Sequence, residues 1–548
     1  MKPTRCTNRW RQWVCCWLAL GALAFAQAPP IGFTYDTEDR LTQVTYPDGR
    51  QINYGYDDMG NLTSVATKND SPPAVLVSEP INGMINVAIA DYQVLVNRTA
   101  GVTGYSVSGL PGGLKMNTGT TTNADGKPAG VIYGTPVIGG VFRVQLNAKS
   151  AVGTGPEVAL GVNISNAFTR IEDGYDIAGR AFAIVPISAI AGGDLGGSLA
   201  LTVARNGGFS GKLVLGTKSY SFKGVFGGQY GDALVTIDRP APLADLTLNM
   251  TLGLEGSIRG MLFGTLSDGV TNAGLDGSVS VFGPSNRATA FAGTKGATYN
   301  VAVMPHGSHA GNDAYPQGAG FAFAKITTGG DVAFAGKLSD GTAFSGKSML
   351  FWNGDAPVWV SLYKGKGSFF GTLMASDNGS IDLLTDNRIS GDFTWERLAM
   401  PGTLYAAGFP TPMSTYLAGG YYVAPARGWR VMDLGNAAGA APVELTLMRG
   451  GLPAPIVSNM TINTSNVVTV FAPNNNSLAL TFTPKSGLFS GRFTTAAPAR
   501  TTTFQGIILP PFGLTPAQGY GHFLLSGATP ADPILSGEAL LDPLVLIP

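Results

Sequence analysis

Three stretches of the chain share one β pattern: ALTVARNGGFSGKL (200–213), AKITTGGDVAFAGKL (324–338) and ALTFTPKSGLFSGRF (479–493). In each stretch an alternating strand runs into a turn, and the chain returns as Phe-small-Gly-basic-apolar. A second Phe-x-Gly strand follows each return, at YSFKGVF (220–226), TAFSGKS (342–348) and TTFQGII (502–508). Because side chains alternate between the faces of a strand, this pattern predicts duplicated antiparallel hairpins and an all-β fold.

The same alternation assigns the side chains of each returning strand to two faces. Phe209, Gly211 and Leu213 share the apolar face, whereas Ser210 and Lys212 point away from it. Each Gly lacks a side chain on the apolar face, so a neighbouring aromatic can lie over it or the strand can bend there. Bent strands favour a sheet that closes and so hides its edges. We therefore predict three related antiparallel meander or barrel-like units.

The N-terminus has the composition of a secretory signal peptide. Four basic residues between Lys2 and Arg11 precede an apolar run from Trp13 to Phe25. A basic start, a short apolar core and a small-residue site predict cleavage after Ala26. The run is too short to span a bilayer as a helix, and no later stretch is long and apolar enough to do so. We therefore expect a secreted or bacterial cell-surface protein with no membrane-spanning segment after the leader is removed.

Cysteine and charge usage restrict the chemistry of the exported part. Cys6, Cys15 and Cys16 all lie in the leader, so the mature chain is expected to have no disulfide and no Cys-based metal site. The leader holds four of the 35 basic residues and none of the 35 acidic ones, which leaves 31 basic against 35 acidic residues. Nucleic acid is not an expected partner of a weakly acidic chain. Only 13% of residues are charged and Gly numbers 76, as in turn-rich β proteins.

Residues 33–66, FTYDTEDRLTQVTYPDGRQINYGYDDMGNLTSVA, predict a meander of short strands with Pro-Asp-Gly and Asp-Met-Gly-Asn turns. The segment resembles the YD repeat of RHS proteins, although Asp39 stands where that family usually has Gly. About one and a half copies are present, too few to form the enclosing β shell of that family. We expect a remnant that adds strands beside the next domain. The matching positions are Tyr35-Asp36, Arg40-Leu41-Thr42, Val44, Tyr46-Pro47-Asp48-Gly49, Tyr54, Tyr56-Asp57 and Gly60-Asn61-Leu62.

The next ninety or so residues contain short strands and a Gly-Leu-Pro-Gly-Gly-Leu hairpin at 109–114, a Gly-Thr-Pro turn at 134–136 and a closing strand at 140–148. These motifs resemble the Ig-like, cadherin-like module of bacterial surface proteins. Some relatives bind calcium between modules, which leaves calcium as an open cofactor. Clustered carboxylates are what calcium needs, yet Glu79 and Asp91 are isolated in the sequence. No other cofactor is expected.

The remainder resembles an unnamed β-rich repeat module of large secreted bacterial proteins, through PQGAGFAF (316–323), LYKGKGSFFGTL (362–373) and GYGHFLLSG (519–527). That resemblance implies no activity. Tyr- and Gly-rich stretches at 288–303 and 415–425 are predicted to open the second and third units. The predicted parts are a signal peptide (1–26), a partial YD repeat (27–70), an Ig-like domain (71–166) and β repeat units at 167–285, 286–400 and 401–548.

Histidines are the candidates for metal binding. His306 and His309 lie in the Gly-rich segment MPHGSHAGND, with Asp313 close by, and two imidazoles with a carboxylate are ligands that a transition metal accepts. A solvated loop between strands is the alternative interpretation. His522 lies in the strand pattern GYGHFLL, and we expect its side chain to face solvent.

Aromatic residues are the candidates for ligand binding. The stretch FWNGDAPVWVSLYKGKGSFF (351–370) contains Trp359 and Tyr363, which an even spacing places on one face of a strand. Aromatic platforms of this kind bind sugar rings in many β modules, whereas the simpler interpretation is that both side chains are core. Trp359 and Tyr363 are therefore speculative ligand-binding residues.

No catalytic constellation is apparent in the sequence. The predicted mature chain has no Cys nucleophile and no G-x-S-x-G elbow before a helix, and carboxylates such as Asp232 and Asp355 are scattered. We expect no enzyme, but an exported multi-domain β protein that serves in adhesion, scaffolding or binding. Its expected partners are surface glycans or other cell-surface proteins. A carbohydrate-binding protein and a calcium-binding cadherin-like adhesion protein are the alternatives.

Overall fold

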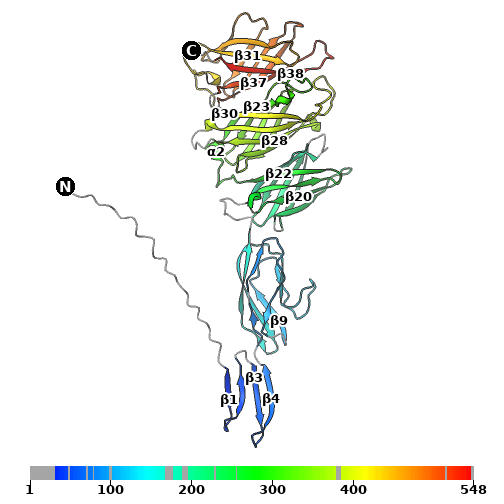
Figure 1. Cartoon of the computed structure of the whole chain (residues 1–548), viewed down its shortest axis with the longest axis vertical. Helices are drawn as coiled ribbons and strands as arrows, with labels where there is room; N and C mark the ends of the chain where they lie inside the picture. Colours follow the sequence, from blue (N-terminus) through cyan, green and yellow to red (C-terminus); the bar gives the residue numbers. More distant parts are fainter. Residues whose placement is uncertain are drawn as a thin grey trace, which may run out of the picture.

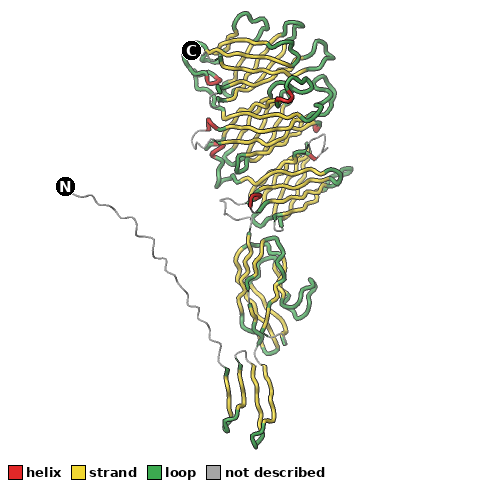
Figure 2. Tube along the Cα trace, viewed as in Figure 1, coloured by secondary structure: helices red, strands yellow, loops and turns green. Residues whose placement is uncertain are grey.

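The computed structural model describes residues 31–46, 50–69, 72–77, 79–97, 101–166, 177–187, 195–227, 230–254, 256–377, 384–511 and 515–544. These residues are almost entirely strands and loops, with helix confined to short turns such as α2 (Thr289–Ala292) (Figure 2). The all-β prediction is confirmed. Figure 1 shows the parts arranged in a row in chain order. The predicted leader and its three cysteines lie outside the described residues.

No helix within the described ranges combines the length and the apolar character needed to cross a membrane.

The first part is a four-stranded antiparallel sheet that pairs with no other strand of the described chain. It therefore forms a sheet of its own and does not extend the next one. The Asp of each Tyr-Asp pair closes a turn: Asp36 accepts hydrogen bonds from the Arg40 backbone N–H (2.9 Å) and Nε (2.7 Å), and Asp57 accepts from the Asn61 N–H (2.8 Å). Its strands are β1 (Gly32–Tyr35), β2 (Leu41–Thr45), β3 (Arg50–Tyr56) and β4 (Leu62–Asn69).

Residues 75–165 form the second part, in which strands of several small sheets share one apolar core. Its longest strand, β12, pairs with both β9 and β14. Whether this part belongs to the Ig-like module stays a prediction. Its strands are β5 (Val75–Leu76), β6 (Ile81–Met84), β7 (Tyr92–Gln93), β8 (Leu95–Val96), β9 (Val102–Ser108), β10 (Leu114–Met116), β11 (Val131–Gly134), β12 (Gly140–Ser150), β13 (Gly153–Thr154) and β14 (Val158–Ser165).

Three separate eight-stranded antiparallel sheets follow, here called barrels 1, 2 and 3. Barrel 1 consists of β15 (Gly179–Val185), β16 (Gly197–Val203), β17 (Gly208–Leu215), β18 (Lys218–Val225), β19 (Asp232–Ile237), β20 (Leu246–Leu252), β21 (Met261–Ser267) and β22 (Asn272–Ser280). Barrel 2 consists of β23 (Ala297–Pro305), β24 (Gly320–Ile326), β25 (Asp331–Lys337), β26 (Ala343–Met349), β27 (Asp355–Leu362), β28 (Gly367–Ser376), β29 (Arg388–Trp395) and β30 (Met413–Tyr421). Barrel 3 consists of β31 (Ala441–Arg449), β32 (Ile456–Ile462), β33 (Val468–Val470), β34 (Ala479–Thr483), β35 (Leu488–Thr494), β36 (Thr501–Leu509), β37 (Gln518–Leu525) and β38 (Leu535–Pro543).

Each barrel is a meander whose first and eighth strands pair, so the sheet nearly closes on itself. The ladder is interrupted between the fourth and fifth strands of barrels 1 and 2, and between the third and fourth strands of barrel 3. The side chains of alternate residues fill the interior, as the burial of Phe209, Leu213 and Leu215 shows. The barrel-like prediction is confirmed, and the three units are separate sheets.

The repeated Phe and Gly residues face one another across paired strands. In each barrel the two Phe-x-Gly strands are antiparallel neighbours, with the register that sets the Phe of one strand opposite the Gly of the other. In barrel 3 a Cβ built on Gly491 would lie 2.2 Å from the Phe504 ring, and one built on Gly506 would lie 2.3 Å from the Phe489 ring. In barrel 3 the absent side chains therefore make room for the rings. The pairs are Phe209–Gly224 and Gly211–Phe222, Phe334–Gly346 and Gly336–Phe344, and Phe489–Gly506 and Gly491–Phe504.

The boundary between barrels 2 and 3 differs from the predicted one. The stretch predicted to open the third unit overlaps β30, which pairs with β23 and β29 and completes barrel 2. The predicted division at residue 400 therefore falls inside one sheet. The Phe-x-Gly motif is also offset: it occupies the second to fourth strands of barrels 1 and 2 but the fourth to sixth of barrel 3.

Buried hydrogen bonds join barrel 3 to barrel 2. The Asn300 side chain on β23 is 1% exposed, and its Nδ2 donates to the Ser486 and Ile508 carbonyls of barrel 3, both at 3.0 Å. The Ser536 Oγ of barrel 3 donates to the Ser339 carbonyl at 2.6 Å, and the Ser536 N–H donates to the Tyr405 hydroxyl at 3.0 Å. Since buried polar groups are costly to leave unpaired, these bonds fix how the two barrels stack.

Hydrogen bonds from one asparagine side chain also join the second part to barrel 1. The Asn86 side-chain Nδ2 donates to the Asn206 carbonyl (2.6 Å) and to the Phe226 carbonyl (3.0 Å). One amide on the second part therefore satisfies two carbonyls of barrel 1.

Candidate functional site

Barrels 1 and 2 meet through a small apolar cluster. Phe182 and Ile184 of β15 and Phe351, which precedes β27, are buried together, and Trp359 of β27 packs against them. A hydrogen bond from the Ser280 Oγ to the Leu350 carbonyl (3.0 Å) crosses the same joint. This contact leaves open space beside it.

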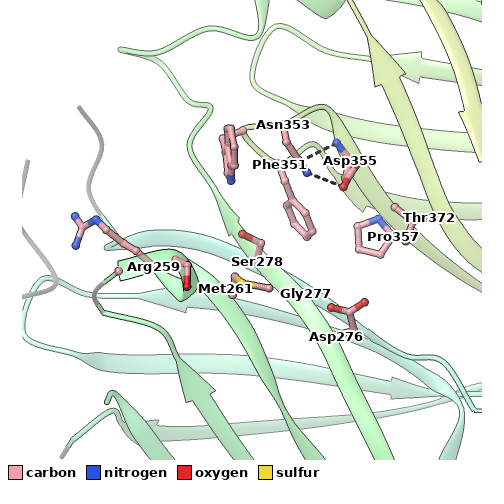
Figure 3. Close-up of a pocket in the computed structure, with 13 residues that line it drawn as sticks. Arg259, Met261, Asp276, Gly277, Ser278, Phe351, Asn353, Asp355, Pro357 and Thr372 are labelled. Carbon is pink, nitrogen blue, oxygen red and sulfur yellow. Dashed lines mark hydrogen bonds between the residues drawn. The ribbon is translucent and has the colours of Figure 1, made fainter. Parts of the chain in front are cut away.

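A cleft of about 420 Å³ lies between the two barrels next to that cluster. One wall comes from η3 (Gly256–Ile258) and the ends of β21 and β22, and the other from the 351–354 turn, β27 and β28. Figure 3 shows side chains from both walls around the opening. The residues that line it are Gly256, Ser257, Arg259, Met261, Asp276, Gly277, Ser278, Phe351, Trp352, Asn353, Asp355, Pro357 and Thr372.

Two carboxylates from different barrels lie at this cleft. Asp276 belongs to β22 of barrel 1, and Asp355 begins β27 of barrel 2. Burial raises the pKa of Asp355, a hydrogen bond from Asn353 opposes that shift, and the negative charge of Asp276 raises the pKa further. The Asn353 Nδ2 donates to Asp355 Oδ2 at 2.6 Å and holds the carboxylate in place (Figure 3). The cleft therefore carries hydrogen-bond acceptors on both walls.

Apolar surface and a cation complete the lining. The Trp352 side chain is 62% exposed and Met261 is 43% exposed, whereas Arg259 is 9% exposed. The Arg259 Nη1 donates to the Leu254 carbonyl at 2.9 Å, which anchors its guanidinium to barrel 1. An exposed indole beside fixed carboxylates and hydroxyls can hold a small polar molecule that also has an apolar face.

Trp359 and Tyr363 do not form the predicted shared face. The even-numbered residues of β27 from Ala356 to Leu362 point into barrel 2, so Trp359 lies on the outer face and packs against Gly196 of barrel 1. Tyr363 follows the end of β27 and has a φ of 52°. This left-handed residue interrupts the period of two and turns the Tyr363 side chain into barrel 2.

Tyr363 is part of a buried polar network. Its hydroxyl donates to Asp340 Oδ2 at 2.6 Å and accepts from the Trp395 Nε1 at 3.0 Å. The Arg397 Nη1 lies 3.1 Å from the same Asp340 oxygen, and the two side chains are 7% and 0% exposed. Burial raises the pKa of Tyr363, with the adjacent Asp340 carboxylate as the next cause. Tyr363 is therefore placed to hold the interior of barrel 2 together.

The three candidate metal ligands are not assembled. The His306 Nδ1 accepts a hydrogen bond from the Ser308 N–H (3.4 Å), the His309 Nε2 accepts from the Ser414 N–H (3.3 Å), and Asp313 is exposed. Among the residues that the structure describes, no three His, Cys, Asp or Glu side chains are grouped to hold a metal ion.

Of the isolated acidic residues of the second part, Asp91 has another side-chain partner. Asp91 accepts two hydrogen bonds from the Lys127 Nζ, at 2.7 and 2.8 Å. The Glu79 carbonyl accepts from the Tyr92 hydroxyl at 3.0 Å, and its residue is exposed. A calcium site at this part stays an untested alternative.

The expectation that His522 faces solvent is wrong. Its side chain is 1% exposed because β37 packs against barrel 2. The His522 Nδ1 lies 2.9 Å from the Ala319 carbonyl of barrel 2, and its Nε2 lies 3.3 Å from the Gln505 Nε2. Burial lowers the pKa of His522 to about 4.

The sequence analysis named Asp355 among the scattered carboxylates and quoted the stretch that contains Trp352 and Asn353. It did not join these residues, and it missed Asp276. Asp276 occupies an outward position of a strand and resembles many solvent-facing residues. Only the docking of barrel 1 on barrel 2 brings it to Asp355, and no local pattern predicts which outer faces meet.

In the comparison with known proteins, one family model matches a short part of the chain. The RHS Repeat family matches residues 35–71, which confirms the predicted RHS-type repeat in β1–β4. A comparison with curated proteins gives no match. One matching solved structure is a Bacteroides fragilis protein provisionally named an alpha-galactosidase/melibiase, which is 22% identical over 18% of this chain, with a TM-score of 0.15. The match covers 18% of the length of that chain, and at this TM-score it supports no inference about activity.

Proposed function

We propose that this chain is an exported, non-enzymatic β protein of the bacterial surface or secreted space, in which a row of barrels carries a ligand-binding cleft. Adhesion or scaffolding is the role that such a row serves, and its partners are surface glycans or surface proteins. The observation that carries the proposal is the stack itself: three barrels joined by buried contacts, with the cleft at one joint.

Two further observations support this proposal. The RHS-type repeat at 35–71 belongs to a family found in secreted and surface bacterial proteins. The amide of Asn300 and the hydroxyl of Ser536 bridge barrels 2 and 3 by buried hydrogen bonds, which gives the stiffness that a presenting scaffold needs.

Fractionation of the native organism, combined with mass analysis of the chain N-terminus, tests export. The expected result is a mature protein that begins close to Gln27 and is found in the secreted or surface fraction. Detection only in the cytoplasm, with Met1 retained, contradicts the proposal.

A further inference from the structure

We propose that the cleft between barrels 1 and 2 binds a neutral saccharide, with the Trp352 indole against one face of a sugar ring. This inference rests on the proposed function, for which it names the ligand class. The cleft differs from the Trp359–Tyr363 platform expected from the sequence, because Trp359 is covered by barrel 1 and Tyr363 is turned inward.

The size and shape of the cleft favour a small molecule. Ligand pockets have volumes of about 300–1,000 Å³, and the cleft has about 420 Å³. A stable protein partner needs roughly 800 Å² of contact on each side, which a hollow of this size does not offer by itself.

The chemistry of the walls matches a sugar ring. Carbohydrate hydroxyls both donate and accept hydrogen bonds, and the cleft offers carboxylate acceptors at Asp276 and Asp355 and an amide at Asn353. The C–H groups of a sugar ring form an apolar face, which an aromatic side chain can cover. Trp352, 62% exposed on the same lining, provides such a surface.

The charges at the cleft determine which saccharides fit. Asp276 and Asp355 come from opposite walls, and the Arg259 guanidinium, which donates to the Leu254 carbonyl, points away from both of them (Figure 3). An anionic sugar would meet two carboxylates in a partly buried space, where like charges repel strongly. Neutral glycans are therefore preferred over sialylated, uronic or phosphorylated ones.

The Asp355 carboxylate is preorganised for this task. The Asn353 side chain donates to Asp355 Oδ2, and its own Oδ1 accepts from the Asp355 N–H at 3.1 Å. The two residues thus fix each other before a ligand arrives, which lowers the ordering cost of binding.

A glycan array tests the proposal with the purified full chain, on neutral and anionic oligosaccharides. The expected result is binding to neutral glycans. The strongest binder is then titrated by calorimetry into wild type, Trp352→Ala and Trp429→Ala. Trp429 is 42% exposed in the loop before barrel 3 and outside the cleft, so it is a matched control. Loss of one ring contact is expected to weaken binding about tenfold for Trp352→Ala and to leave Trp429→Ala unchanged.

Thermal melts establish that both variants remain folded, as expected for exposed side chains. The proposal is overturned if no neutral glycan binds, if anionic glycans bind more tightly, or if Trp352→Ala binds like wild type. Export is measured separately by fractionation. If the protein is found at the surface but binds no glycan on the array, this inference alone is overturned. A cytoplasmic protein overturns the proposed function itself.

Discussion

Acidification should weaken the joint between barrels 2 and 3 through His522. The Gln505 amide has its Oε1 3.2 Å from the Lys337 Nζ, so its Nε2 faces the imidazole. An acceptor is therefore required at His522 Nε2, and the proton resides on Nδ1, which donates to the Ala319 carbonyl. A second proton would face the amide N–H, and an amide flip would place N–H against Lys337. The joint thus favours neutral His522.

The size of the effect follows from the pKa of His522. Burial lowers the pKa of the His522 imidazole to about 4 in the folded chain, against 6.5 for the ordinary side chain. Because the folded pKa is lowered, the stabilisation is present in full above pH 6.5 and is lost as the pH falls toward 4. Because the unfolded chain binds this proton more tightly, the free energy of unfolding should fall by about 2 kcal/mol between pH 7 and pH 5.

Denaturant unfolding of the full chain at pH 7 and pH 5 measures this loss in wild type and in His522→Asn. Asn keeps a donor for the Ala319 carbonyl but does not titrate. Glu538 lies opposite His522 in register, and burial raises its pKa, so its titration acts in the opposite sense. That contribution is shared by both proteins and cancels in the comparison.

The variant is expected to lose about 2 kcal/mol less than wild type on acidification. His306→Asn, at an exposed loop position, serves as the control and should follow wild type. Equal pH dependence in wild type and His522→Asn would refute the buried, neutral state of this imidazole.

Three further sets of substitutions test the packing of the barrels. Gly491→Val should lower the unfolding free energy by about 1–3 kcal/mol, because the new side chain meets a phenylalanine ring. Arg492→Gln, at the exposed neighbouring position, should change it by no more than about 0.5 kcal/mol. Equal, small effects of both substitutions in denaturant melts would contradict the Phe–Gly pairing. Asn300→Ala should cost about 1–3 kcal/mol, since the buried Ile508 carbonyl and the partly buried Ser486 carbonyl lose their donor, and calorimetry should show barrels 2 and 3 unfolding less cooperatively. Arg397→Met should cost about 3–5 kcal/mol, because it leaves the Asp340 carboxylate buried without its cation, and an additional Asp340→Asn change should recover part of that loss in the same melts.

The strand pattern predicted the fold because alternation is a local property. Phe209, Gly211 and Leu213 lie on the predicted face, and the empty space over Gly211 is filled by the ring of Phe222, which the sequence placed on the next strand. The alternation of side chains along each strand was therefore sufficient to predict barrel-like units.

The error at the boundary of barrel 2 has a structural cause. The predicted openings of two units, at 288–303 and 415–425, overlap β23 and β30 of a single barrel. These are its first and last strands, and they pair where the sheet closes. The two strands share a Tyr- and Gly-rich composition and lie on the two sides of one closure. They do not begin two separate units.

The site could not be predicted because it depends on contacts between barrels. Trp359 and His522 are both on outer faces of their own barrels, and each is covered only by the neighbouring barrel. Tyr363 leaves the predicted face because one left-handed residue ends the alternation. Asp276 and Asp355 come to one cleft from separate sheets. Each outcome follows from docking or from a single dihedral angle, neither of which leaves a periodic signal in the sequence.

Small-angle X-ray scattering of the full chain tests directly whether the three barrels act as one rigid row that holds the cleft open. The structure predicts a scattering profile that is reproduced with barrels 1, 2 and 3 in one fixed, extended arrangement. The profile should change little when salt is added, because buried hydrogen bonds and apolar contacts hold the joints besides the exposed Arg180–Asp331 ion pair between barrels 1 and 2. A profile that requires barrels 1, 2 and 3 to reorient freely would contradict the rigid row.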